Sequence, residues 1–174
     1  MNRLQLATLL SWAGVAGIQG RKRLQKIVFF LQKAGCPLDC HYTLHHFGPY
    51  SRDVADACDE MVAAGLIEET VEPQNGVVQY AYTLKPAIRD MVAREPDTHV
   101  QPFEELGCEL IDPAKTPIWR LELGSTILYF FKTSNGWDDA LAKACEFKRV
   151  KVEDRPSQAA MELAKRVQTR ALNQ

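Results

Sequence analysis

Two cysteines and three histidines crowd into a short stretch of this chain. They are Cys36, Cys40, His41, His45 and His46. Thiolates and imidazoles are the ligands that zinc prefers, so the stretch is a candidate zinc site. Structural zinc sites, however, usually join one closely spaced ligand pair to a second pair far along the chain, and here all candidates lie together. We therefore predict buried thiols, partly exposed histidines, no bound metal and no cofactor.

The same stretch is a poor candidate for nucleophilic catalysis. Cys40 has a histidine beside it, but nothing nearby supplies a recognisable oxyanion hole or an acid to orient the imidazole. Elsewhere the sequence has no phosphate-binding glycine loop, no paired-carboxylate signature and no dinucleotide fingerprint. We predict that the protein is not an enzyme.

Composition narrows the class of partner and the compartment. The 174 residues carry a formal net charge of -1, so binding to a polyanion would require a local basic patch. No apolar run approaches the roughly 20 residues that span a bilayer, which argues against a membrane protein. Five cysteines, an odd number without a convincing secretory signal, indicate free thiols in a reducing cytoplasm.

The elements that position these residues can be read from hydrophobic spacing and turn signals. Helices are predicted over residues 2–16, 21–35 and 51–65, with a short strand near 40–47 and a short helix over 86–94. The turn Gly48, Pro49, Tyr50 and Ser51 precedes the third helix, and Ser51 is predicted to be its N-cap. Residues 66–84 read as a hairpin around Pro73–Gly76, since Asn-Gly is a strong turn signal. This order is that of a winged helix-turn-helix, placed at residues 1–95.

The second part, residues 96–174, reads as mainly helical and packed on the first, so the fold class is α+β. Its helix over residues 118–131 is apolar nearly all round, which is typical of a core helix or of an oligomer interface. The positions concerned are Trp119, Leu123, Ile127, Phe130 and Phe131. We expect a homodimer or a tight complex built on this half.

Three stretches carry a family resemblance. They are "RKRLQKIVFFLQKAG", "YTLHHFGPYSRDVADACDEMVAAGLIEE" and "LELGSTILYF". Together they resemble the bacterial YwgA-like family of winged-helix proteins. More distantly, the first two resemble Panacea antitoxin-like domains, which share a K-L-Q-K helix followed by a GP turn; this chain has Arg23 at the first of those four positions. The resemblance implies a winged-helix fold and a non-catalytic role, and the Panacea likeness implies neutralisation of a toxin.

The third predicted helix is the one that a winged helix usually offers to the DNA major groove. At about 100° per residue, its outer face collects four carboxylates and one guanidinium, and hairpin acids extend it. The face comprises Arg52, Asp53, Asp56, Asp59, Glu60, Glu68 and Glu69. Such a surface repels phosphates, so a basic protein surface is the expected partner. The alternative is that the acids only solvate the helix.

Basic residues gather instead on the second predicted helix. They are Arg21, Lys22, Arg23, Lys26 and Lys33. This stripe could contact nucleic acid or an acidic partner, or could be the ordinary solvent face of an amphipathic helix. The sequence therefore favours a regulatory module that binds a protein. The alternative is a DNA-binding transcriptional regulator that uses the basic stripe.

Overall fold

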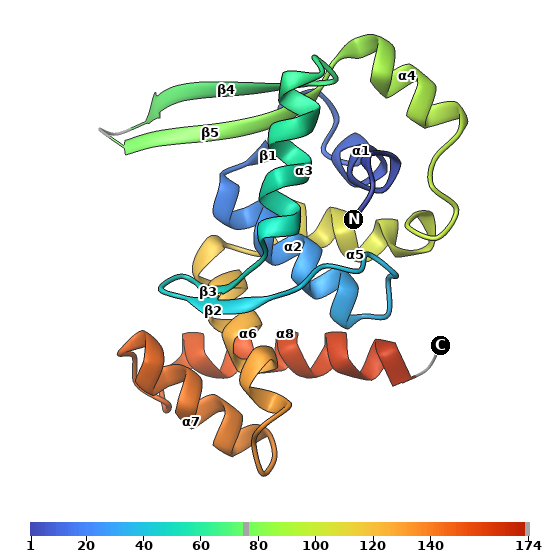
Figure 1. The fold of residues 1–174 in the computed structure, drawn as a ribbon. Helices are drawn as coiled ribbons and strands as arrows, with labels where there is room; N and C mark the ends of the chain where they lie inside the picture. The colour runs from blue at the N-terminus through green and yellow to red at the C-terminus, as the bar shows by residue number, and fades with distance from the viewer. Residues whose placement is uncertain (75–76, 173–174) are drawn as a thin grey trace.

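The computed structural model describes residues 1–74 and 77–172, and the side chains of residues 72–79 lie outside that description (Figure 1). The first part of the chain alternates helices with short strands. Its elements are α1 (Arg3–Ser11), a 3-10 turn (Gly14–Ala16), β1 (Ile18–Gln19), α2 (Arg21–Lys33), β2 (Thr43–His45), β3 (Gly48–Tyr50), α3 (Arg52–Ala63), β4 (Ile67–Gln74), β5 (Val77–Leu84) and α4 (Pro86–Arg94). The predicted hairpin and the helices predicted over 21–35, 51–65 and 86–94 are confirmed, with ends shifted by up to two residues. The helix predicted over 2–16 is shorter, because α1 ends at Ser11 and a 3-10 turn follows. The predicted turn residues Asn75 and Gly76 lie outside the described residues.

The strands form two small antiparallel sheets. One has the order β1-β5-β4, and the other is the hairpin of β2 with β3. The two-residue strand β1 pairs Ile18 with Tyr82, and it was not predicted from the sequence. Gly17 makes this pairing possible, because it has a φ of 64° and a Cβ there would lie 2.5 Å from the Tyr82 carbonyl oxygen. Strand β3 was not predicted either, because it contains Gly48 and Pro49 and both residue types have a low propensity for strands.

The second part of the chain is helical. Its elements are a 3-10 turn (Gln101–Phe103), α5 (Glu104–Ile111), α6 (Ile118–Phe131), α7 (Trp137–Lys148) and α8 (Arg155–Leu172). In Figure 1, α6, α7 and α8 lie together on the side of α2 opposite the β4–β5 hairpin. The mixture of helices and antiparallel strands makes the fold α+β, as predicted. No helix in the described residues is long and apolar enough to cross a membrane.

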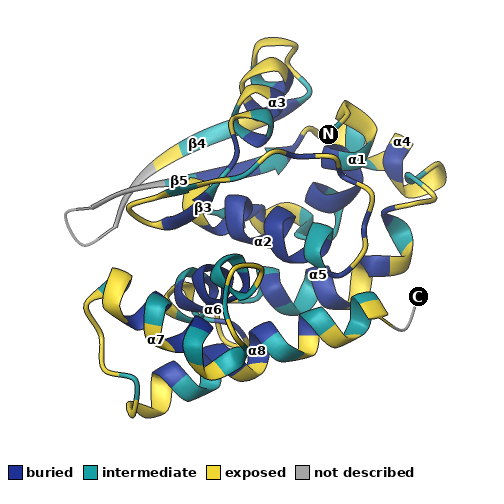
Figure 2. Ribbon diagram, turned by 60° about the horizontal axis from the view of Figure 1, so that its bottom comes forward, coloured by how far each residue is buried: buried dark blue, intermediate teal, exposed yellow. Residues whose placement is uncertain are grey.

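Helix α2 lies at the centre of the molecule and is buried on all sides over residues 23–31 (Figure 2). It contacts α3, β1 and β3 from the first part and α5, α6 and α8 from the second. The hydrophobic core accordingly includes buried apolar side chains of both parts. The division at residue 95 stays a prediction, and α2 is where the two parts meet.

Helix α6 is the core of the second part. Leu123 and Ile127 are buried, and Phe130 and Phe131 are half-buried. The Phe131 ring stacks on Trp137 with 3.9 Å between the ring centroids. Trp119 differs from these four, because 45% of its surface is exposed. The apolar character of the helix is thus largely explained by packing within the chain, and self-association stays a prediction.

Candidate functional site

The turn before α3 is fastened to α2 by two buried polar side chains. Gln25 donates from Nε2 to the Ser51 carbonyl oxygen and accepts from the Ser51 backbone N–H, both at 2.9 Å. Lys26 donates from Nζ to the Pro49 carbonyl oxygen at 2.5 Å. Ser51 stands at the N-cap position, but no capping hydrogen bond from its side chain is found, so the predicted capping role is wrong. The backbone of Ser51 takes part in the junction through Gln25.

A second glutamine of α2 holds the chain just before β2 in the same way. Gln32 donates to the Cys40 carbonyl oxygen at 2.9 Å and accepts from the Cys40 N–H at 2.8 Å. Because Gln25 and Gln32 are seven residues apart, they lie on the same side of α2, two turns from each other. The sequence reading missed this pair of contacts. Two glutamines seven residues apart in one amphipathic helix were the available signal.

The outer face of α3 is acidic and exposed, and it forms the main part of the candidate interface. Asp56, Asp59 and Glu60 are exposed on α3, and Glu68 is exposed on β4. The opposite side of the helix is buried at Val54, Ala57, Cys58 and Met61. Figure 2 shows exposed positions along α3, in contrast to the buried α2. The helical spacing therefore separated the inner from the outer side of α3 correctly.

Two arginines reduce the charge of this face without cancelling it. The Arg52 Nε lies 3.4 Å from Asp56, one helical turn away, and an Arg3 guanidinium nitrogen lies 3.6 Å from Glu60. All four side chains of these pairs are more than half exposed, so water and salt screen both attractions. These contacts leave the carboxylates accessible to a partner.

Two acids of the predicted face are already engaged within the chain. Asp53 is half-buried and accepts a hydrogen bond of 2.7 Å from the His41 N–H, which is the main cause of its lowered pKa. Glu69 accepts two hydrogen bonds from the Arg21 guanidinium, at 2.7 and 3.0 Å. We therefore define the acidic face as the four exposed acids, Asp56, Asp59, Glu60 and Glu68.

The predicted basic stripe is not one solvent-facing surface. Arg21 and Lys22 are exposed and Lys33 is half-buried, but Arg23 and Lys26 are only 4% and 2% exposed. The expectation of an exposed stripe is wrong, because β3, α5 and α6 pack against α2 and cover part of the side that was expected to face solvent. Two of the five cations are therefore unavailable to a phosphate backbone.

The buried cations have structural partners. Arg23 donates at 2.8 Å to the carbonyl oxygens of Leu110 and Thr116, where α5 ends and the loop to α6 runs. The bond to Leu110 satisfies one of the carbonyl groups that the end of α5 leaves without a partner in the helix, and the bond to Thr116 holds the following loop. Burial lowers the pKa of Lys26 to about 8, and the nearby Lys148 and Lys22 ammonium groups act in the same direction. Burial, with Lys132 close by, also lowers the pKa of Lys33 to about 8.

The cysteine–histidine cluster is divided between the core and the surface. Cys36 and Cys40 are buried, and His41, His45 and His46 are exposed. Burial raises the pKa of the Cys36 thiol to about 12, which disfavours the thiolate that binds metal. In the described part of the chain, no three cysteine, histidine or acidic side chains are grouped so that they could hold a metal ion, and all five cysteines are unpaired.

Comparisons with known proteins give a local match. No protein-family model matches the chain. A stretch of 67 residues is 36% identical to a protein of Bacillus subtilis (strain 168) described as "uncharacterized protein YwgA". The match covers 38% of this chain and 40% of that relative. The chain is thus similar to YwgA over less than half the length of either protein.

Proposed function

We propose, from this likeness and the geometry above, that the chain is a bacterial, cytoplasmic, non-enzymatic winged-helix module whose α3 face binds a protein partner. The order α1, β1, α2, α3, β4, β5 and the sheet order β1-β5-β4 support the winged-helix assignment. In such a module the helix before the hairpin, here α3, is the one presented to the ligand. The β2–β3 hairpin and the helices after α4 are additions to that plan.

The observation that carries the proposal is the charge on the exposed side of α3. The acidic face has four carboxylates, and the neighbouring Arg3 and Arg52 supply two positive charges, which leaves an excess of two negative charges. Binding to DNA depends on cations that neutralise phosphates, so this face opposes a duplex. A basic protein surface complements it. The more distant likeness to antitoxin-like domains makes a toxin protein one form that such a partner could take.

The rival function, a DNA-binding regulator, would have to use the cations of α2. Arg21 is occupied by Glu69, and the Lys22 ammonium lies 3.5 Å from a Glu122 carboxylate oxygen. With Arg23 and Lys26 buried, the described structure offers no continuous row of free cations along α2. These contacts favour a protein partner over nucleic acid.

Capture of partners from the native host tests the proposal. The tagged wild type is compared with the double variant Asp56→Lys, Glu60→Lys and with a matched control, Glu146→Lys, Glu162→Lys, which makes the same charge change at exposed sites of α7 and α8. We expect the first variant to lose a partner that the control keeps, because like charges at a complementary interface repel. Retention of every partner by the first variant would refute the proposal.

Matched melting curves complete that test. Exposed substitutions usually change stability by less than about 0.5 kcal/mol, so both double variants should unfold near the wild-type temperature. Loss of a partner would then report the surface and not a defect in folding.

A further inference from the structure

A cavity of about 390 Å³ lies between α2, the β2–β3 hairpin, α3 and β5. Its walls include Lys22 and Lys26 from α2, Phe47 and Tyr50 from the hairpin, and Tyr82 from β5. The volume is within the range of sites that hold small molecules, about 300–1,000 Å³. The cavity is separate from the outer side of α3, and only Asp59 belongs to both.

Positive charge is concentrated at the hairpin end of this cavity. Glu122 of α6 lies 3.5 Å from the Lys22 ammonium and 3.6 Å from the Lys148 ammonium. Lys26 lies close enough to interact electrostatically with all three of these side chains. Three ammonium groups therefore gather around Glu122, with an excess of two positive charges. One carboxylate does not balance three ammonium groups, so an anion that entered here would be stabilised.

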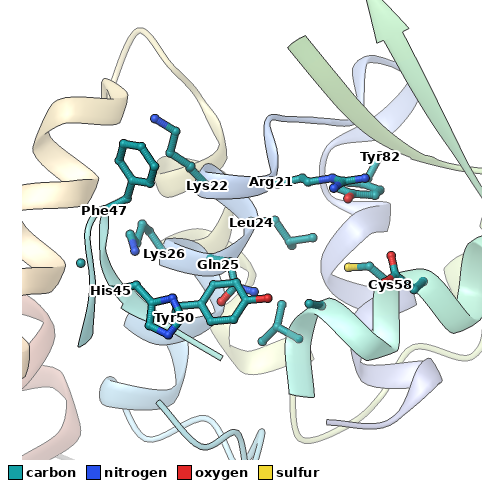
Figure 3. A pocket seen from close by; sticks show the side chains of 14 residues that line it. Arg21, Lys22, Leu24, Gln25, Lys26, His45, Phe47, Tyr50, Cys58 and Tyr82 are labelled. Carbon is teal, nitrogen blue, oxygen red and sulfur yellow. The ribbon is translucent and has the colours of Figure 1, made fainter. Parts of the chain in front are cut away.

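The opposite end of the cavity has one excess negative charge. Arg21 lies there beside Tyr82 (Figure 3) and is paired with Glu69. Asp59 of α3 also lines the cavity. Arg21, Lys22, Lys26 and Asp59 line the cavity, whereas Glu69, Glu122 and Lys148 lie next to those side chains but are not part of its lining. Together these groups are four cations and three carboxylates. The net charge around the cavity is thus one positive, which suits a ligand with a single negative charge.

Aromatic rings surround the positive end. His45 and Tyr50 stack with 4.6 Å between their centroids, and Lys22 lies 3.8 Å above the Phe47 ring. Phe47 is 47% exposed, so part of its ring is accessible from solvent. Figure 3 shows Lys22 and Lys26 extending from α2 toward Phe47, with the rings of His45 and Tyr50 next to them. Aromatic walls of this kind pack against planar rings.

We propose that this cavity binds a small aromatic monocarboxylate, with its carboxylate against Lys22 and Lys26 and its ring against the aromatic side chains of the hairpin. The excess positive charge favours an anionic group on the ligand, and the aromatic side chains favour a planar apolar ring. Bound there, the ligand would contact the hairpin, α2 and α3 at once, and it would tie the position of α3 to the presence of a small molecule. This inference does not depend on the protein-binding proposal.

Titration of isotope-labelled full-length protein with 3-phenylpropionate, followed by backbone amide chemical shifts, tests the inference. We expect saturable shifts at Lys22, Gly48 and Tyr50 at ligand concentrations up to about 10 mM, which detects dissociation constants in the millimolar range. The neutral analogue 3-phenylpropanamide should bind about tenfold more weakly, because it cannot form charge-assisted hydrogen bonds. Inorganic phosphate should also bind weakly, since it has no ring.

Variants locate the site without risk to the fold. Lys22→Gln removes a half-exposed ammonium and should weaken 3-phenylpropionate about tenfold, whereas Lys115→Gln, at an exposed site after α5, should change the affinity less than about twofold. Lys26 is not used, because it also holds the Pro49 carbonyl. The inference would be overturned by the absence of saturable shifts, by equal binding of the amide or of phosphate, or by equal effects of the two substitutions.

Discussion

Replacement of Gln25 by methionine tests how the turn before α3 is held. Methionine has a similar volume and flexibility, so it fills the site but offers no hydrogen-bonding group. The Ser51 backbone, which is 0% exposed, would then lose both 2.9 Å hydrogen bonds. The Ser51 N–H would be left without a partner, which costs about 1–3 kcal/mol. The Ser51 carbonyl keeps a 3.4 Å hydrogen bond from the Ala55 N–H, so its loss is about 0.5–1.5 kcal/mol and the two together predict about 1.5–4.5 kcal/mol. This is a large share of the 5–15 kcal/mol that is typical for a domain.

Urea unfolding measures the effect. We expect Gln25→Met to lower the midpoint with an unchanged slope, and Gln32→Met to do so less, because the Cys40 backbone that Gln32 holds is less deeply buried. Gln168→Met, at a half-exposed position of α8, is the matched control and should stay within about 0.5 kcal/mol. If Gln25→Met also stayed within that margin, the view that α2 clamps the hairpin would be refuted.

Three further substitutions test other contacts of the structure. Gly48→Ala should destabilise the fold by about 2–4 kcal/mol in urea unfolding, because φ is 93° and the new Cβ would lie 2.6 Å from Thr126 Oγ1; a cost below about 0.5 kcal/mol would contradict this packing. Arg23→Met should lower the unfolding free energy by about 2–4 kcal/mol, since buried carbonyl oxygens near the end of α5 lose their donor; unchanged stability would show that water replaces it. Lys26→Met tests linkage to pH: the pKa of Lys26 is lowered to about 8 from 10.5, so the unfolded chain binds more protons between these values. The wild type should therefore gain about 2 kcal/mol relative to Lys26→Met between pH 7 and pH 9.5, and a constant difference in unfolding free energy across this range would show that the amine is not buried as described.

The sequence was informative where local spacing decides the outcome. Helix α3 has its buried side at Val54, Cys58 and Met61, as the helical period requires, and the acids lie on the other side. The β4–β5 hairpin could be predicted from its turn residues and extended runs in the same way. Strand β1 is only two residues long and adjoins glycines, so neither periodicity nor propensity could indicate it.

Burial of the α2 cations could not be read from α2 itself. Lys26 and Arg23 look like solvent-facing positions of an amphipathic helix, and they are buried because segments far along the chain cover them. The partners of Arg23, for example, are 87 and 93 residues away in the sequence. The contacts of Asp53 with His41 and of Glu69 with Arg21 likewise depend on the tertiary structure. The acidic face predicted from the sequence therefore included two acids that are bonded within the chain.

Titration of a labelled DNA duplex, followed by fluorescence anisotropy at low and moderate salt, tests most directly whether the charge of α3 decides the class of partner. We predict negligible binding by the wild type and a rise in affinity for Asp56→Lys, Glu60→Lys, because two repulsive charges are replaced by two attractive ones. The control Glu146→Lys, Glu162→Lys should show a smaller rise. Tight, steeply salt-dependent binding by the wild type that the α3 substitutions leave unchanged or weaken would contradict a protein-binding role for the acidic face.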